Sequence, residues 1–204
     1  TLPREEGAEE EEYQPRRERR EQREPRERFD RQNGKKVHIQ TLAAMNPSAD
    51  SYEALFEAAC RIGVPPGELR QLFRSMVLNV LGGNVDDHNK NFSFLMDDDG
   101  HWHVAPTYDY TFSVDPDAPY YVNRHSMTIN NKTEGITAED LLEVARRYGI
   151  KAAEPFIEKA IGIVSHYPEY GREAGVGEEW IGTIEKEIAA RIECVSDNRA
   201  DRLK

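Results

Sequence analysis

The sequence predicts a mainly α-helical domain that carries one small antiparallel β-ribbon. Three observations indicate this class. A stripe of apolar residues recurs at helical spacing in the middle of the chain, a capping signature precedes a later helical segment, and two short apolar stretches flank a turn. The 204 residues suffice for one domain and a tail, and no internal repeat is visible.

The composition separates a charged tail from a domain, and it argues against several classes of protein. Residues 1–28 are almost all Glu, Arg, Pro and Gln, which predicts a charged, disordered tail before a domain at 29–204. The net charge of -11 argues against a direct nucleic-acid partner. Cys60 and Cys194 are too few for a disulfide framework. No apolar run matches a membrane helix or signal peptide, so we expect a cytoplasmic chain with no membrane partner.

Two helices are predicted first. Asp50 or Ser51 can cap a helix that runs to about residue 62. Pro65-Pro66 opens a second helix, which Gly82-Gly83 ends. Its apolar positions form a stripe that faces the core: Leu69, Leu72, Phe73, Met76, Val77, Val80 and Leu81.

The predicted ribbon follows this second helix. FSFLM at 92–96 and WHVAP at 102–106 read as two short strands, joined by a DDDG turn. Residues 111–135 form a long loop, with a further short strand expected at MTI, residues 127–129.

Three more helices are predicted towards the carboxy terminus. Thr137 and Asp140 form a capping box before a helix that runs to about Tyr148. Two further helices are expected near 152–166 and 176–194.

The richest polar stretch is NVDDHNKN, residues 84–91, which connects the buried helix to the first strand of the ribbon. Asp86 and Asn91 lie on this rigidly flanked loop, and the hairpin can fold Asp109 back beside Asn91. Three side chains would then converge with oxygen atoms that can bind a metal or accept a hydrogen bond. Mg²⁺ prefers oxygen and takes few protein carboxylates besides phosphate and water. The pattern therefore indicates a nucleotide-dependent phosphoryl-transfer site.

Each polar side chain has a predicted role there. Asn91 and Asp109 would hold the metal, and Asp86 would accept a proton from an attacking hydroxyl. Lys90 would neutralise a phosphate. The step of five residues from Asp86 to Asn91 matches the catalytic loop of protein kinases.

Structural interpretations of the polar residues stay open beside the functional ones. Asp, Asn and His between a helix and a strand often only cap or form turns. His101 and His103 share a strand face and form either a surface pair or an incomplete metal site. Residues 97–99 fit a polar turn better than a calcium loop. The remaining isolated histidines include His38, His125 and His166.

Three stretches resemble the HipA family of bacterial toxin kinases: ERFDR at 27–31, GNVDDHNKNFSFL at 83–95 and APTYDY at 105–110. The resemblance covers about residues 27–195. It implies the helical carboxy-terminal lobe of a protein-kinase-like fold, in a serine/threonine kinase that uses ATP and Mg²⁺. The spacing Asp-x-His-x-x-Asn also resembles the catalytic loop of phosphatidylinositol-kinase-like enzymes.

The resemblance also implies residue roles and partners. Asp86 would be the general base, and Asn91 and Asp109 would hold the metal. The nucleotide-binding residues that it implies are Phe29, His88, Lys90, Asn91, Tyr108 and Asp109. Phe29 lies in the hinge segment that meets the adenine. Family members are toxins, some of which phosphorylate glutamyl-tRNA synthetase, and a helix-turn-helix antitoxin restrains them.

One departure from the family divides the functional expectations. The family's hinge follows an ATP-binding lobe, whereas the 26 residues before Glu27 contain no Lys and no glycine-rich loop. We therefore expect either a kinase lobe that works with a separate amino-terminal lobe, or a truncated, inactive binding or regulatory module. A third hypothesis is a metal-dependent phosphohydrolase that uses Asp86, Asp87, His88 and Asp109. It lacks enough histidine ligands.

Overall fold

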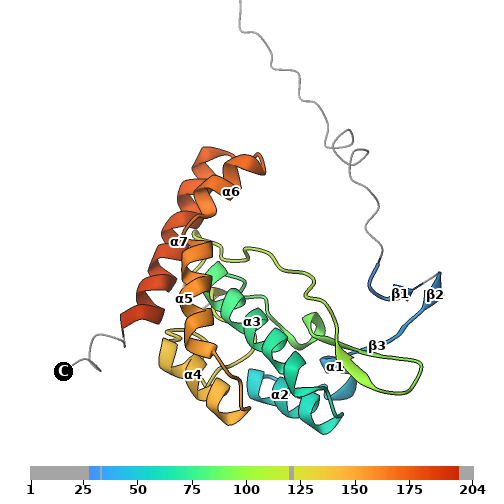
Figure 1. The fold of residues 1–204 in the computed structure, drawn as a ribbon. Helices are drawn as coiled ribbons and strands as arrows, with labels where there is room; N and C mark the ends of the chain where they lie inside the picture. Colours follow the sequence, from blue (N-terminus) through green and yellow to red (C-terminus); the bar gives the residue numbers. More distant parts are fainter. Residues whose placement is uncertain (1–27, 33, 120–121, 198–204) are drawn as a thin grey trace, which may run out of the picture.

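One long helix lies at the centre of the fold (Figure 1). The computed structural model describes residues 28–32, 34–119 and 122–197. Its helices are α1 (Leu42–Met45), α2 (Tyr52–Arg61), α3 (Pro66–Gly82), η1 (Asn89–Asn91, a 3₁₀ turn), α4 (Ala138–Arg147), α5 (Ala153–Val164), α6 (Tyr167–Glu173) and α7 (Glu178–Ser196). Helix α3 packs against α2, α5 and α7. Within these described ranges, no helix has the length and apolar character needed to cross a membrane.

A three-stranded antiparallel sheet lies beside the helices. Its strands are β3 (His38–Thr41), β4 (Ser93–Met96) and β5 (Trp102–Val104), in the order β3-β4-β5. The predicted ribbon is confirmed as β4-β5, with Leu95 paired to His103. The sheet also contains β3, which the sequence did not predict, paired through Ile39 and Leu95. A separate hairpin joins β1 (Arg31–Gln32) to β2 (Lys35–Lys36).

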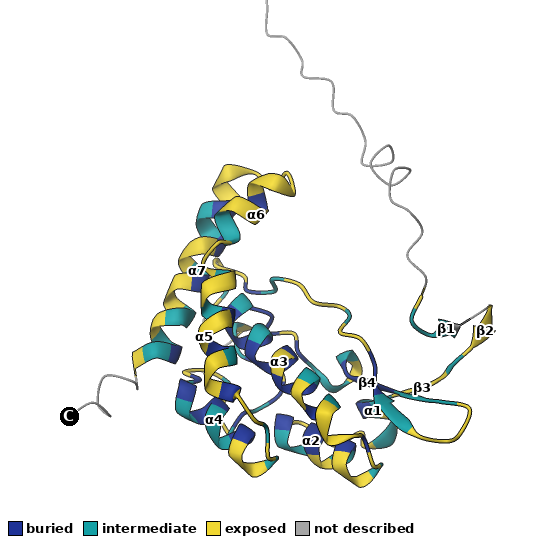
Figure 2. Ribbon diagram, in the orientation of Figure 1, coloured by how far each residue is buried: buried dark blue, intermediate teal, exposed yellow. Residues whose placement is uncertain are grey.

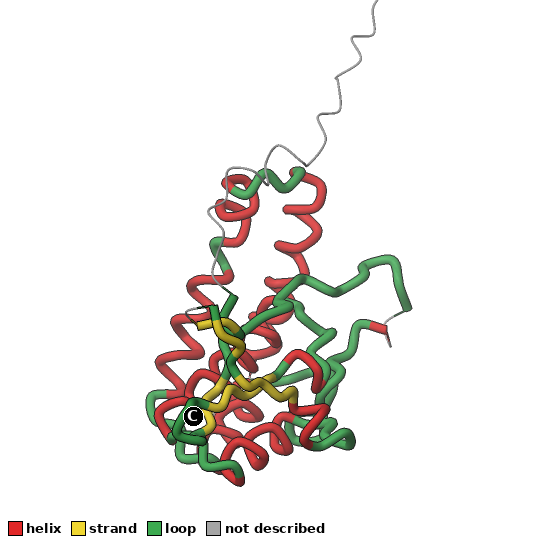
Figure 3. The backbone as a smooth tube through the Cα atoms, turned by 90° about the vertical axis from the view of Figure 1, so that its right-hand side faces the viewer, coloured by secondary structure: helices red, strands yellow, loops and turns green. Residues whose placement is uncertain are grey.

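The long loop between β5 and α4 projects from the helices (Figure 3). The strand expected at residues 127–129 is wrong. This segment makes only isolated bridges, from Thr128 to Ser51 and from Ile129 to Lys132. Met127 and Ile129 are nevertheless buried, which explains their apolar character without a strand.

Helix α3 buries the predicted stripe. All seven of its apolar residues are buried against the neighbouring helices and sheet. Gly83 ends the helix with φ 69°, a left-handed conformation that favours glycine. A Cβ on Gly82 would lie 2.0 Å from the Tyr110 hydroxyl, which donates to the Leu78 carbonyl. The glycine pair therefore lets the segment after Asp109 pack closely on the end of α3.

The predicted helix starts are confirmed, and two helices, α1 and α6, were missed. The Ser51 hydroxyl accepts from the Ala54 amide at the start of α2. Thr137 and Asp140 form the capping box of α4, and the Lys132 ammonium adds a 2.8 Å ion pair to Asp140. The unpredicted α6 is mostly exposed (Figure 2). The predicted tail at 1–28 lies outside the described residues except for Arg28.

A charged cluster fastens the β4-β5 hairpin to α3. His103 Nδ1 lies 2.8 Å from a Glu68 oxygen, and its Nε2 lies 3.2 Å from Asp97. The other Glu68 oxygen accepts from the Val104 amide. His101 Nδ1 lies 3.4 Å from the same Asp97 oxygen, so the two histidines share this carboxylate at the surface. Hydrogen bonding to Glu68 first, and to Asp97 second, raises the pKa of His103.

The stability contributed by this cluster should depend on pH. Because the folded state raises the pKa of His103, its contribution is complete below the unfolded value of about 6.5 and is lost as pH rises through the folded value. The side chain is 38% exposed, so we expect only roughly 0.2–1 kcal/mol. Urea unfolding between about pH 5.5 and 8.5 should show that His103→Gln is less stable than wild type at the acid end. A difference that grows with pH would contradict this assignment.

Candidate active site

The polar octet is a tightly anchored connection between α3 and β4. The amides of Val85 and Asp86 both donate to the Ser113 hydroxyl, at 2.8 and 3.0 Å. The Ser113 amide in turn donates to the Gly83 carbonyl. On the other side, the Asn89 carboxamide donates to the Ala49 carbonyl at 2.9 Å. The loop is thus fixed to segments that lie far away in the sequence.

Asp87 is the buried anchor of this loop. Its side chain is 0% exposed. One carboxylate oxygen accepts from the Tyr52 hydroxyl at 2.7 Å and lies 2.8 Å from His125 Nδ1. The other accepts from the amides of Ser126 and Met127. A carboxylate with all these partners cannot serve as an open metal ligand, which weakens the phosphohydrolase hypothesis.

A chain of hydrogen bonds extends from Asp87 through the core. Burial first, and the Asp87 charge second, raise the pKa of Tyr52, so its phenol stays protonated and donates. Asn79 donates to the Tyr52 oxygen, and Asn84 donates to Asn79. The Ser113 hydroxyl donates to Asn84 at 3.4 Å. Because Ser113 also accepts from Val85 and Asp86, the hydrogen-bond network connects Asp87 to the start of the octet. His125, isolated in the sequence, is part of this network.

Asp86 contrasts with its neighbour. Its side chain is 63% exposed, and its only described charged contact is a long one of 3.8 Å to His88 Nε2. The Asn91 carboxamide donates to the Asp86 carbonyl at 2.9 Å, which leaves the Asn91 side-chain oxygen free to bind a ligand. His88 Nδ1 is buried and has no hydrogen-bond partner in the described part of the chain. The octet therefore presents a carboxylate, a carboxamide oxygen and an imidazole together.

Tyr108 joins the second half of the candidate site to the first. Its hydroxyl donates to the Lys90 carbonyl at 2.8 Å and contacts the Ser93 hydroxyl. Its ring stacks on Phe29, with centroids 5.7 Å apart. Partial burial raises the pKa of Tyr108, which keeps the phenol neutral as a donor. The residue before Asp109 thus contacts the residue before Asn91, as the folding-back of the hairpin requires.

Asp109 has an unusual backbone for a residue that is not glycine. Its φ is 54°, in the left-handed region, and its side chain is exposed. Strained backbones of this kind are found at functional sites. No hydrogen bond or ion pair to its carboxylate is formed by the described residues. The carboxylate is therefore available to a ligand from outside the chain.

The residues present fit a hard cation and a polyphosphate. Asn91 and Asp109 offer side-chain oxygen atoms that no hydrogen bond or ion pair from the described residues occupies, and Mg²⁺ prefers such ligands. Lys90 is exposed and can meet a phosphate. A second group of metal-binding type, Asp97, Asp99 and His101, occurs in the described residues at the hairpin tip. There Asp97 accepts from the amides of Asp99 and His101, as expected of a polar turn.

Among the site residues predicted from the sequence, Tyr108 contacts both the Phe29 ring and the backbone carbonyl of Lys90. The structure brings Asp86, His88 and Asn91 together within the octet. Glu27, in the predicted hinge segment, lies outside the described residues. The sequence did not indicate that Asp87 and His125 anchor the loop, because their partners are far apart along the chain.

Comparisons with known proteins identify a matching family and a similar fold. The HipA-like C-terminal domain family matches residues 18–169, more than half of the chain. A search of curated proteins gave no match. The fold is similar to a chain in the Shewanella oneidensis MR-1 toxin–antitoxin complex of HipA, HipB and operator DNA. The TM-score is 0.56 at 21% identity, over 83% of this chain and 47% of that chain.

The structural likeness concerns the fold alone at this identity. The chain spans about half the length of the solved relative that it matches. The family match covers the octet and the Tyr108-Asp109 segment, together with most of the helices described above. The chain therefore belongs to the HipA-like C-terminal domain family.

Proposed function

We propose that this chain is the carboxy-terminal lobe of a HipA-like serine/threonine protein kinase, which transfers a phosphoryl group from ATP to a protein hydroxyl. The observation that carries the proposal is the contrast within the octet. Asp87 is wholly buried and holds the loop in place, whereas Asp86 is exposed and has no short partner. A positioned carboxylate on a fixed loop suits a general base.

The remaining residues have complementary roles in this proposal. Asp86 accepts the proton of the substrate hydroxyl as that oxygen attacks the terminal phosphorus. Asn91 and Asp109 would hold Mg²⁺, which neutralises charge on the phosphates when it is bound. Lys90 and His88 would meet the phosphates, and the Phe29–Tyr108 stack would support the adenine side. Positioning and electrostatics supply most of the rate in such transfers.

The partners follow from the family and its solved relative. That relative is a HipA protein solved with HipB and operator DNA, and this chain spans about half of its length. We propose that this chain likewise belongs to the toxin of a toxin–antitoxin pair, meets an antitoxin of the HipB kind, and shares the nucleotide with an amino-terminal lobe. The alternative, an inactive binding module, would keep the same fold without nucleotide binding.

Paramagnetic mapping tests where the metal and nucleotide bind. Mn²⁺ can replace Mg²⁺ and broadens nearby amide resonances. With ATP present, we expect the strongest broadening at Asn91 and Tyr108–Tyr110, and its loss in Asp109→Ala. Asp98→Ala is the matched control, since Asp98 is also an exposed aspartate. Broadening centred on Asp97–His101 in place of Asn91 would contradict the proposal.

A further inference from the structure

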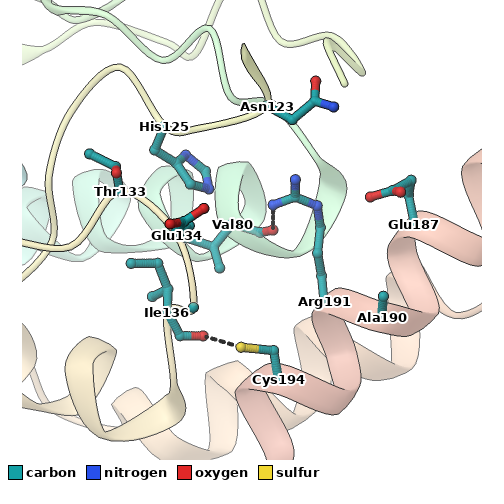
Figure 4. Close-up of a pocket in the computed structure, with 11 residues that line it drawn as sticks. Val80, Asn123, His125, Thr133, Glu134, Ile136, Glu187, Ala190, Arg191 and Cys194 are labelled. Carbon is teal, nitrogen blue, oxygen red and sulfur yellow. Dashed lines mark hydrogen bonds between the residues drawn. The ribbon is translucent and has the colours of Figure 1, made fainter. Parts of the chain in front are cut away.

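A cavity of about 190 Å³ lies outside the candidate active site. Its walls are the loop at 123–136, the end of α3 at Val80, and the carboxy-terminal half of α7 (Figure 4). Exposed residues at its rim, Glu134 and Ala190, open it to the surface. None of the candidate kinase residues lines it.

Two buried polar atoms of the residues that line this cavity have no hydrogen-bond partner in the described part of the chain. The His125 side chain is 2% exposed, and its Nε2 is buried without a hydrogen bond among the described residues. Arg191 donates from one terminal nitrogen to the Val80 carbonyl at 3.3 Å, but its Nε is also buried and unpartnered. Figure 4 shows the imidazole and the guanidinium beside the same cavity, with a terminal nitrogen of Arg191 on the side of His125 and Nε on the side of Glu187. Buried polar atoms are normally satisfied, so the unpartnered His125 Nε2 beside a cationic guanidinium favours a bound group in the cavity.

The charge around Arg191 points to an anion. Burial lowers the pKa of its guanidinium, with Glu187 acting in the opposite direction. Even so, in the part of the chain that the structure describes, Arg191 forms no ion pair within 4.0 Å. The other carboxylate of the cavity, Glu134, is held by Arg124 at 3.1 Å. A half-buried cation without a close counter-ion favours an oxyanion.

The tautomer of His125 favours one class of oxyanion, a hydrogen phosphate group, over a carboxylate. Asp87 accepts from every other partner, so the hydrogen of the Asp87–His125 bond is assigned to Nδ1. Nε2 then offers a lone pair to the cavity when the ring is neutral, and an N–H when it is charged. A hydrogen phosphate group satisfies both forms, because it carries P–OH and P–O⁻ together. A carboxylate satisfies only the charged form.

We propose that this cavity is a second binding site, which takes the phosphoryl group of a small molecule between the Arg191 guanidinium and His125 Nε2. Through His125 and Asp87, the bound group contacts the same hydrogen-bond network that holds the octet. The site goes beyond the proposed kinase function and does not depend on it. A metal fits less well, since the described residues of this cavity include no three ligands at metal spacing.

Inorganic phosphate is the probe for this site. In amide-resolved NMR titrations at constant ionic strength, we expect shifts to cluster at residues 123–136 and 187–195, and to saturate. Arg191→Gln should weaken this binding about tenfold or more, because a charge-assisted hydrogen bond is lost. Arg146→Gln removes an equal charge from a helix surface, and should leave the binding unchanged.

Wild-type mapping is decisive by itself, even if the Arg191 variant folds poorly. Absence of saturable shifts at 123–136 and 187–195 would overturn the proposal. Shifts confined to residues 86–91 would also overturn it, since they would place phosphate only at the candidate kinase site. Equal weakening in Arg191→Gln and Arg146→Gln would show a diffuse charge effect, and would reject a defined cavity site.

Discussion

Asp87→Asn is expected to destabilise the domain by about 3–5 kcal/mol, because it removes the charge of a buried carboxylate and disrupts the hydrogen bonds that this carboxylate accepts. Asp87 accepts from Tyr52, Ser126 and Met127 and pairs with His125. An asparagine keeps the shape but turns one acceptor into a donor that faces existing donors. Thermal unfolding should show a decrease of roughly 6–20 °C in Tm.

The neighbouring residue supplies the control for this prediction. Asp86→Asn makes the same chemical change one position earlier, on an exposed side chain. We expect its free energy of unfolding to stay within about 0.5 kcal/mol of wild type. If both variants unfolded at the same temperature, the assignment of Asp87 as the anchor of the loop would be wrong.

Asp86→Asn should instead abolish function without disturbing the fold. An asparagine cannot accept the proton of the substrate hydroxyl, so phosphoryl transfer should slow by about 10²–10⁴-fold. ATP affinity should remain close to wild type, since Asp86 is not assigned to the metal. Transfer from radiolabelled ATP to protein measures this, with the amino-terminal lobe supplied where the chain alone gives no turnover.

A second exposed aspartate supplies the control for this prediction. Asp98→Asn, on the exposed hairpin tip, should keep the wild-type rate. A full rate in Asp86→Asn would remove Asp86 as the base. A loss of ATP affinity equal to the loss of rate would assign Asp86 to binding, since only an interaction made in the transition state lowers the rate alone.

Local patterns in the sequence predicted the local structure well. The stripe of α3 and the capping box of α4 depend on residues three or four positions apart, and both are present. Strand β3 was missed because its four residues are at most half buried, and only the distant β4 holds them. Helix α6 was missed because Pro168 and Gly171 interrupt a short, exposed segment.

The candidate site depends even more on contacts between distant residues, which the sequence does not reveal. The sequence drew attention to the octet and to Asp109, since so many polar groups beside apolar strands are unusual. It could not separate Asp86 from Asp87, because burial is decided by packing against Tyr52 and His125, 35 and 38 residues away. The cavity at Arg191 depends on α7 reaching α3, a contact across 111 positions.

The most direct test of the central claim is a calorimetric titration of the purified chain with ATP and Mg²⁺, beside Asp109→Ala. We expect saturable binding in the wild type that disappears in the variant and remains in Asp98→Ala, because the proposed function assigns Asp109 to the metal that joins nucleotide to protein. Equal heats in wild type and Asp109→Ala, or no heat in either, would contradict a working metal–nucleotide site in this chain.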